Sequence, residues 1–533
     1  MAARAVGSFV IPAKAGIQWL LLAALAFQAG AASFRWAAAG DHVTADPHAQ
    51  DAQLTNALNL HVYEPLVMRG KRLELLPALA ERWEQVSPTE WRFHLRRHVK
   101  WHDGTPFTSD DVVFSFARAR GPTSNYRAYA TAVGMPRAID SHTVAFTTPA
   151  PNPVMLDMLA GIMVMSRAWC EKHRSTAAQD FAAREETYAA RHANGTGAFR
   201  LAERVPDVHS RFERNPAWWG IAAGVFDGNV DTMTFSTIRS DATRMAGLRS
   251  GSLDLVHDPP VQDVEALRRD ARVKVIEGRE NFVVFLGMDQ ARESLLHGDA
   301  AGRNPFKDRR VRLAIYHAID AAALDRVVNR GFSVATAVPL PHPEGAGIPA
   351  GSIPRYPHDE AAARRLLAEA GWADGFAVTL DCLNARDKAC VAIAGMLARV
   401  GIRVAVNSMP TPQFLAKGQR RDTSFYMLGW GSASPEAIFL LQRVFHSRDA
   451  TGDGDGNWGD YRDATLDALI DRAKAEMDLA QRRALVREAM RRVHDNVYYI
   501  PLHHRISPWA ARANVEAVHR ANNHLHAAWV RIR

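Results

Sequence analysis

The segment 429–436 combines residue types that suit non-covalent capture of a small molecule. It follows an apolar run, 425–428, which predicts a buried strand. Gly429 and Gly431 would let a ligand approach the backbone, and Trp430 offers a broad apolar face. The hydrogen-bonding side chains that follow are Ser432, Ser434 and Glu436. The residues alone leave two interpretations open: a ligand-binding loop, or an ordinary turn from a strand to a helix with a core tryptophan.

Sequence motifs that would indicate catalysis are missing. There is no H-E-x-x-H, no G-x-S-x-G, no G-x-x-x-x-G-K-[ST], and no G-x-G-x-x-G after a strand. The sequence therefore favours binding over catalysis, and no cofactor is expected. A hydrolase remains an alternative, because catalytic sites assemble from distant residues.

The stretch 91–116 indicates the type of scaffold. Apolar and polar residues alternate over 91–95, which predicts a half-buried strand. Asp103-Gly104 supplies a turn. Thr108 and Asp111 form a capping box, which predicts a helix that begins there. Further strands and helices alternate toward the C-terminus: strands at 376–380 and 401–406, a helix capped by Asp359, and a helical tail over 466–493. This alternation predicts an α/β protein.

The sequence of residues 91–116 closely resembles the signature motif of the family 5 extracellular solute-binding proteins. These are the peptide- and nickel-binding receptors of bacterial ABC importers. Four later segments are also similar to motifs of that family. They are 195–199 (G-T-G-A-F, with Ala198 in place of a proline), 214–219 (R-N-P-A-W-W), 251–255 (G-S-L-D-L) and 304–320. Any one of these motifs alone would be weak, but together they are specific.

The resemblance implies a two-lobed periplasmic-binding-protein fold (type II, three-domain cluster C) with an inserted domain in lobe one. The limits carried over are a signal peptide at 1–32, lobe one at 33–70, 195–280 and 500–533, the inserted domain at 71–194, and lobe two at 281–499.

The resemblance also implies a function. The chain would be the extracytoplasmic receptor of an ABC transporter. It would capture a short peptide or peptide-like solute between two closing lobes and deliver it to a membrane permease with its ATPase. We expect a monomer. The alternatives are a receptor for a metal chelate or other small solute, and a peptide carrier or sensor that serves no transporter.

Several binding residues follow from the resemblance. Peptide-binding members carry an Asp, which pairs with the ligand's ammonium group, where this chain has Ala433. The sequence of the segment instead resembles that of the family branch that includes glutathione-binding receptors. Our hypothesis is that Glu436 supplies the anionic contact to the ligand. A helix-capping role for Glu436 is the competing interpretation. The other ligand-binding positions carried over are Asp51, Gln53, Tyr126 and His504, with His503 predicted to point to the opposite face of its strand.

Composition and the N-terminus agree with an exported receptor. The chain has 533 residues, enough for more than one core, and 47% are hydrophobic. Its net charge is +8, but the 65 Lys and Arg residues are interspersed with 57 acidic residues and form no basic block. We therefore expect no nucleic-acid binding. Arg4 and Lys14, an apolar run over 17–27 and Ala29-Gly30-Ala31 predict a cleavable signal peptide and a periplasmic protein. An N-terminal membrane anchor is the alternative.

Two further features stay open in the sequence. Cys382 and Cys390 are close enough along the chain to form a disulfide, which would leave Cys170 free, but spacing does not establish a bridge. The loop 449–460 imitates a calcium-binding loop, yet it lacks the apolar residue at position 8 and the bidentate Glu at position 12. We therefore predict no metal site.

Overall fold

The computed structural model describes residues 32–533 with the exception of 182, 184, 185 and 451. Apart from Ala32, the predicted signal peptide lies outside the described residues. Within the described part of the chain, no helix is both long enough and apolar enough to cross a membrane.

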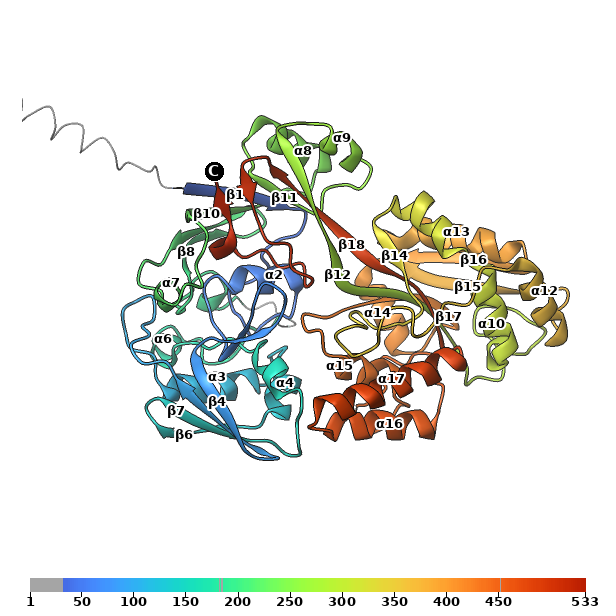
Figure 1. Cartoon of the computed structure of the whole chain (residues 1–533), viewed down its shortest axis with the longest axis horizontal. Helices are drawn as coiled ribbons and strands as arrows, with labels where there is room; N and C mark the ends of the chain where they lie inside the picture. The colour runs from blue at the N-terminus through green and yellow to red at the C-terminus, as the bar shows by residue number, and fades with distance from the viewer. Residues whose placement is uncertain (1–31, 182, 184–185, 451) are drawn as a thin grey trace, which may run out of the picture.

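Two long strands join the two lobes. They are β12 (Val273–Met288) and β18 (Tyr499–Arg512), which cross between the lobes in Figure 1. Both belong to a 12-stranded sheet of order β13-β15-β17-β12-β18-β11-β1-β10-β9-β8, in which β14 also pairs with β18, and β16 with β15. One continuous sheet therefore runs through both lobes, which confirms the predicted two-lobed α/β fold.

Lobe one contains the end of this sheet that runs from β11 through β1 to β8. Its strands are β1 (Ala32–Ala38), β8 (Phe199–Val205), β9 (His209–Arg214), β10 (Val230–Thr237) and β11 (Leu255–His257). Its helices are α2 (Gln53–Asn59), α7 (Trp219–Ala222), α8 (Asp241–Ser250) and α9 (Val264–Arg268). Strand β1 is parallel to both β10 and β11, and four of its apolar residues are buried, as is typical of parallel sheets: Phe34, Trp36, Ala37 and Ala38.

A smaller unit extends from lobe one. Its four-stranded sheet has the order β4-β5-β7-β6, with β4 (Ala80–Ser87), β5 (Glu90–Leu95), β6 (Pro136–Asp140) and β7 (Thr143–Thr147). The other elements of this part of the chain are β2 (Val67–Arg69), β3 (Leu75–Pro77), α3 (Ser109–Ala119), α4 (Arg127–Ala132), α5 (Met155–Leu159) and α6 (Arg167–Lys172). The strand predicted over 91–95 and the capping box of Thr108 and Asp111 are confirmed, and the helix begins at Ser109.

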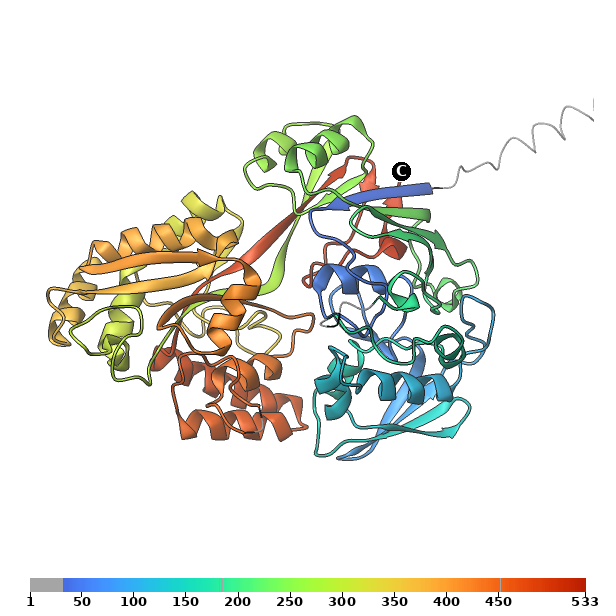
Figure 2. The ribbon, with the colours of Figure 1, turned by 180° about the vertical axis from the view of Figure 1, so that it is seen from behind.

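Lobe two places helices on both faces of its strands, as Figure 2 shows from behind. The strands are β13 (Gly298–Asp299), β14 (Ser333–Ala335), β15 (Phe376–Leu383), β16 (Ile402–Met409) and β17 (Phe425–Gly431). Helices α10 (Arg309–Ala318), α12 (Glu360–Glu369) and α13 (Asp387–Ala398) share one apolar core. Helices α14 (Thr411–Gln419), α16 (Ala464–Ala475) and α17 (Leu479–Asp495) share the other. Short elements complete the chain: α11 (Ala321–Ala323), the π-helical turn η3 (Leu324–Asn329), α15 (Ile438–Leu440), β19 (Val515–Glu516) and β20 (Arg531–Ile532).

The helical tail differs from its prediction. The single helical stretch expected over 466–493 is two helices, α16 and α17, because the chain leaves the helix at Glu476. The side chain of Asp478 then accepts a hydrogen bond from the backbone N–H of Gln481 and starts the second helix. The other predicted elements are confirmed, including the helix that Asp359 caps and the strands at 376–380 and 401–406.

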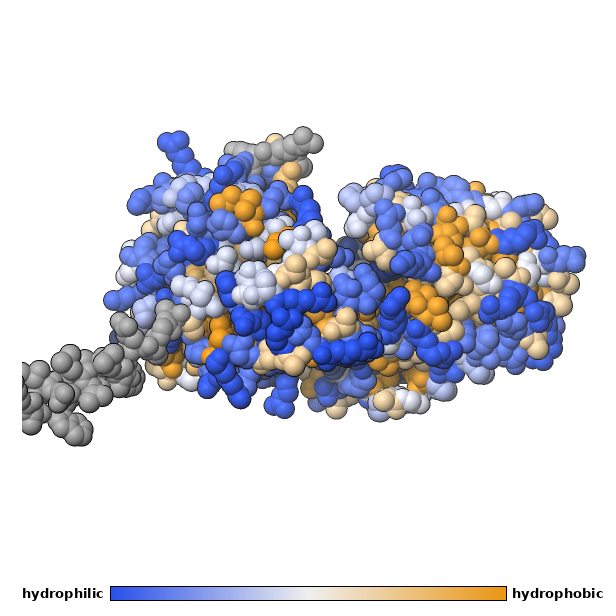
Figure 3. Space-filling view, turned by 90° about the horizontal axis from the view of Figure 1, so that it is seen from above, coloured by the Kyte–Doolittle hydropathy of each residue, from blue (hydrophilic) through white to orange (hydrophobic). Residues whose placement is uncertain are grey.

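The junction between the lobes is marked by a break in pairing. Arg279 of β12 pairs with Ile506 of β18, but the next pair is Val283 with His504. The three residues 280–282 of β12 therefore lie opposite one residue of β18, Arg505. Such a bulge interrupts the ladder and bends the strand. Seen from the side of α8 and α9, the two lobes are separated by a hollow (Figure 3).

Candidate ligand-binding site

The carboxyl ends of three strands meet at the edge of lobe two that faces lobe one. Strand β15 is parallel to both β16 and β17, so all three end on the same side. Ligands of open α/β sheets bind in the crevice outside such strand ends. The predicted segment 429–436 lies at the end of β17, and Arg386 follows the end of β15. Sequence reasoning missed Arg386.

Arg386 is a half-buried cation for which the described residues supply no carboxylate partner. Its guanidinium lies over the ring of Phe282, 5.5 Å from the centroid, and Arg505 lies over the same ring at 4.6 Å. Among the described residues, Arg386 forms no ion pair with a carboxylate. Burial, followed by the positive charge of Arg505, lowers the pKa of Arg386 to about 10. A half-buried guanidinium without a carboxylate partner favours an anionic ligand group beside it.

Two rows of side chains cross the strands next to Arg386. Val283 of β12 pairs with Trp430 on one side and with His504 on the other, so the structure brings these two predicted residues onto one face. Gly429 and His503 flank Val284 on the opposite face. His503 and His504 therefore point to opposite faces of β18, as expected.

Trp430 and His504 contribute different surfaces. The Trp430 ring is half-buried against the core of α16 and α17, and Arg443 lies 5.8 Å from its centroid. His504 is buried, and neither of its ring nitrogens has a hydrogen-bond partner in the described structure. Burial lowers the pKa of His504 to about 3, so its ring is neutral near pH 7.

The loop after β17 makes mostly internal contacts. Oγ of Ser434 donates a hydrogen bond to Asp157 and accepts one from the N–H of Glu436. The Glu436 carboxylate accepts the N–H of Ala437 at 2.9 Å, and its other oxygen lies 3.6 Å from Arg482. Burial raises the pKa of Glu436. The carboxylate thus caps the following turn, and its proposed ligand contact stays a prediction. Of the other predicted residues, Gly431 is exposed opposite Phe282, and Ser432 accepts the N–H of Ser434.

The facing wall belongs to lobe one and the inserted unit. Asp51 is exposed and accepts hydrogen bonds from Nδ2 of Asn56 at 2.8 Å and from the hydroxyl of Tyr126 at 3.3 Å. The structure therefore brings Asp51 and Tyr126 together, but the Tyr126 ring is buried in the core of the inserted unit. Gln53 donates to Oε1 of Glu280 at 3.0 Å, and Arg505 donates to the other oxygen of the same carboxylate.

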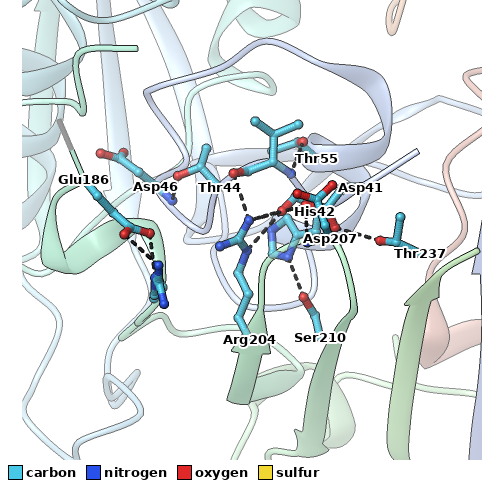
Figure 4. Close-up of polar contacts among 12 residues, drawn as sticks. Asp41, His42, Thr44, Asp46, Thr55, Glu186, Arg204, Asp207, Ser210 and Thr237 are labelled. Atoms are coloured by element: carbon cyan, nitrogen blue, oxygen red, sulfur yellow. Dashed lines mark hydrogen bonds and ion pairs between the residues drawn. The ribbon is translucent and has the colours of Figure 1, made fainter. Parts of the chain in front are cut away.

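Polar contacts fix the segment from Asp41 to Thr55, which precedes and enters α2 (Figure 4). Arg204 of β8 donates to the backbone carbonyls of His42 and Val43. The ring of His42 is hydrogen-bonded to Ser210 of β9 at 3.0 Å, and the hydroxyl of Thr55 accepts the N–H of Val43. These bonds tie the loop to the sheet, so the wall of the site is held before any ligand arrives.

Asp258 is a second residue that sequence reasoning missed. It follows β11, its backbone φ is +50°, and its side chain is 58% exposed. Its carboxylate lies 2.9 Å from Nδ1 of His257. Although partial enclosure raises the pKa of Asp258, the charges of His257 and Arg505 hold it well below its usual value. An exposed carboxylate in this conformation at a strand end makes Asp258 a candidate binding residue. The Asp-Pro-Pro that follows a short apolar strand was the available sequence signal.

Arg505 is the charged residue that connects the two sides of the junction. Its positive charge lowers the pKa of Asp258 in lobe one and that of Arg386 in lobe two, and its guanidinium shares the Phe282 ring with Arg386. Glu280 already has partners: it accepts hydrogen bonds from Arg505 at 2.7 Å and from Ser507 at 2.6 Å. The arrangement suits a ligand with separated positive and negative groups.

Comparison with known proteins identifies the family. The profile of the bacterial extracellular solute-binding proteins, family 5 (middle), matches residues 74–452. The chain belongs to this family. It is 24% identical to heme-binding protein A of Haemophilus influenzae over 85% of this chain and 83% of that protein. It is also 24% identical to the periplasmic oligopeptide-binding protein OppA of Salmonella typhimurium, over 87% and 86% respectively.

Solved structures show the same fold. The periplasmic binding protein DppA of Helicobacter pylori, in complex with the peptide STSA, superposes with a TM-score of 0.75 at 23% identity. The match covers 94% of this chain and 98% of that one. The family 5 fold is therefore present over almost the whole described chain.

A possible metal cluster lies outside the site. Ligand atoms of His446, Asp453 and Asp471 are within 4.8 Å of one another. However, Nζ of Lys474 contacts both carboxylates and supplies a positive charge. Asp460 of the calcium-like loop pairs with Arg421 at 2.6 Å. Since cations of the protein already neutralise these carboxylates, we assign no metal to the cluster.

Proposed function

We propose that this family 5 protein is the extracytoplasmic receptor of an ABC importer for a short peptide or peptide-like solute. The carrying observation is the guanidinium of Arg386, which lies over the Phe282 ring at the end of β15 and forms no ion pair with a carboxylate of the described residues. Arg386 would hold the anionic group of the ligand. Asp258 and Asp51, both exposed, would attract its ammonium group. The relatives named for oligopeptides and the complex with STSA support this ligand class.

Closure of the lobes is the proposed mechanism. The two walls come from different lobes, so a solute that contacts both binds the closed arrangement better than the open one and shifts the population toward it. The bulge of β12 at 280–282 is the place where the connecting strands can bend. The chain would act in the periplasm as a monomer, after removal of the predicted signal peptide, and would present the closed form to a permease and its ATPase. We keep the predicted domain limits as the proposed moving units.

Ligand recovery tests the proposal. The protein would be exported to the periplasm of a bacterial host, purified without denaturant and weighed by native mass spectrometry before and after unfolding. We expect an excess mass that is released intact and carries both an amine and a carboxylate. An empty protein whose melting temperature is unchanged by a peptide library would contradict the peptide class. A ligand released as cleaved products would contradict the receptor function.

A further inference from the structure

Cys382 and Cys390 bracket the turn that carries Arg386. Cys382 lies near the end of β15, Arg386 is in the short turn that follows, and Cys390 is in the first part of α13. Both thiols are fully buried in the same apolar core, between the sheet and this helix. The turn that presents the proposed anion-binding guanidinium is therefore anchored at both ends by a cysteine.

The two thiols lie beside the same methionine. Sγ of Cys390 is 3.8 Å from Sδ of Met427, and Met427 follows Tyr426 of β17, which pairs with Asp381, the residue before Cys382 on β15. All three sulfur-containing side chains belong to one buried core. Both cysteines are free thiols in this structure, and so is Cys170, which is buried in a different core. A strand and the next helix thus bring the two thiols to the same methionine, and a disulfide between them requires Cα atoms about 4.4–6.8 Å apart.

We propose that Cys382 and Cys390 form a disulfide that fixes the geometry of the Arg386 turn. The oxidant is a small-molecule or protein disulfide encountered during folding. One thiolate attacks a sulfur of that disulfide and releases its first thiol. The second cysteine then attacks the mixed disulfide and releases the other thiol. Two protons and two electrons pass from the protein thiols to the oxidant, and one sulfur–sulfur bond replaces another.

The consequence concerns the ligand site. The bond closes a short loop around Arg386, so it removes conformational freedom from this turn in the unfolded chain and during local opening. The guanidinium would then be held beside Gly429 and Phe282 before the ligand arrives. This reading of the disulfide's role rests on the proposed function, whereas formation of the bond does not.

Thiol counting after refolding tests the bond itself, independently of export and of ligand. The reduced, unfolded chain is refolded in a buffer of glutathione and glutathione disulfide, unfolded again without reductant and alkylated. We expect one alkylated cysteine, Cys170, and a mass lower by two hydrogen atoms than that of the reduced chain. Tryptic peptides should show Cys382 linked to Cys390. Three alkylated cysteines would overturn the proposal.

Two variants and one dynamic measurement complete the test. Cys390→Ala should leave two alkylated cysteines, and Cys170→Ala should leave none. Reduction should lower the melting temperature of wild type and of Cys170→Ala by about 5 °C, but not that of Cys390→Ala. Hydrogen exchange over 383–389 should be about tenfold slower in the oxidised protein. Equal exchange in the two redox forms would overturn the role in fixing Arg386, even if the bond forms and even if ligand recovery fails.

Discussion

Ser434 and Asp157 connect the two sides of the molecule: Oγ of Ser434 donates a 2.6 Å hydrogen bond to Oδ1 of Asp157. Ser434 belongs to the loop after β17 in lobe two, and Asp157 belongs to α5 of the inserted unit. Nearby, the rings of Tyr129 and Phe439 meet edge to face at 5.8 Å, and Val154 packs into the core of lobe two. The walls of the site therefore touch at this point.

Loss of this contact should favour opening. Ser434→Ala removes the donor with little change in volume, and Asp157 keeps its ion pair with Arg69. A net hydrogen bond contributes about 1 kcal/mol, so we expect a shift of about fivefold toward the open form. Small-angle X-ray scattering of the ligand-free protein should show a larger radius of gyration. Ser250→Ala, at an exposed position in α8, is the control and should leave the radius unchanged. An identical radius for both variants would contradict the prediction.

Arg386 should dominate the affinity for an anionic ligand group. Because hydrogen bonds to charged groups contribute about 1.5–3 kcal/mol, we expect Arg386→Ala to weaken binding about 10- to 100-fold by isothermal titration calorimetry. The recovered ligand with its carboxylate converted to an amide should bind both proteins with similar affinity. Arg403→Ala, on the exposed side of β16, is the matched control. A loss of the same size in Arg403→Ala would point to general electrostatics instead.

Local elements of the fold could be predicted because their signals are local. The alternation over 91–95 and the capping pair of Thr108 and Asp111 each act within a few residues, and both gave the observed element. The break between α16 and α17 was missed because helix-forming residues surround it. The one local signal for the start of the second helix is its N-cap residue, Asp478. A prediction based on helical periodicity gives one capping residue little weight against the many apolar residues that continue the pattern.

The site could be predicted only in part, since it depends on contacts between distant segments. The segment 429–436 was found from its composition, and it lies at a strand end. Asp258 and Arg505 are far apart in sequence, and only the pairing of β11 with β18 brings them near one another. Arg386 was missed for a similar reason: it lies beside Gly429 and Phe282, which no spacing rule connects to it.

Gly429 is required by the close approach of Arg386. A Cβ at Gly429 would overlap with Nη2 of Arg386 and lie 2.7 Å from the Phe282 ring. Gly429→Ala should therefore displace the guanidinium and reduce affinity about tenfold, with a stability loss of about 1–3 kcal/mol from overpacking. Gly395→Ala in α13 is the opposite control, because no atom lies within 4 Å of its added Cβ. It should raise the free energy of unfolding by about 0.5–1 kcal/mol and leave affinity unchanged. Full affinity in Gly429→Ala would contradict this account of Arg386.

A buried ion pair holds the inserted unit to lobe one. Nη1 and Nη2 of Arg118 donate to the two oxygens of Asp46 at 2.8 and 2.6 Å, and both side chains are fully buried. Arg118→Met leaves a buried carboxylate without its partner, so we expect a loss of about 3–5 kcal/mol in urea unfolding. Asp46→Asn combined with Arg118→Met should cost less than the sum of the single changes. Arg120→Met, at an exposed position, is the control. Additive costs would show that the two residues act independently.

Mild acid should destabilise the protein through its buried histidines. Burial lowers the pKa of His42, His48 and His61 to about 4, below the value of 6.5 in the unfolded chain. As the pH falls below 6.5, these histidines become protonated in the unfolded chain but stay neutral in the folded chain. The free energy of unfolding therefore decreases until the pH reaches about 4. Each histidine should cost about 1 kcal/mol between about pH 7.5 and about pH 5.5. Burial of Glu64 raises its pKa to about 7, which opposes this trend by a similar amount.

Urea unfolding at the two pH values measures the balance. The buried histidines outnumber Glu64, so the free energy of unfolding should fall on acidification. His48→Gln should lessen the fall, because it removes one of the groups that titrate. His358→Gln, at an exposed position, is the control and should not change it. A free energy that rises from pH 7.5 to pH 5.5 would show that carboxyl groups such as Glu64, and not the histidines, control stability in this range.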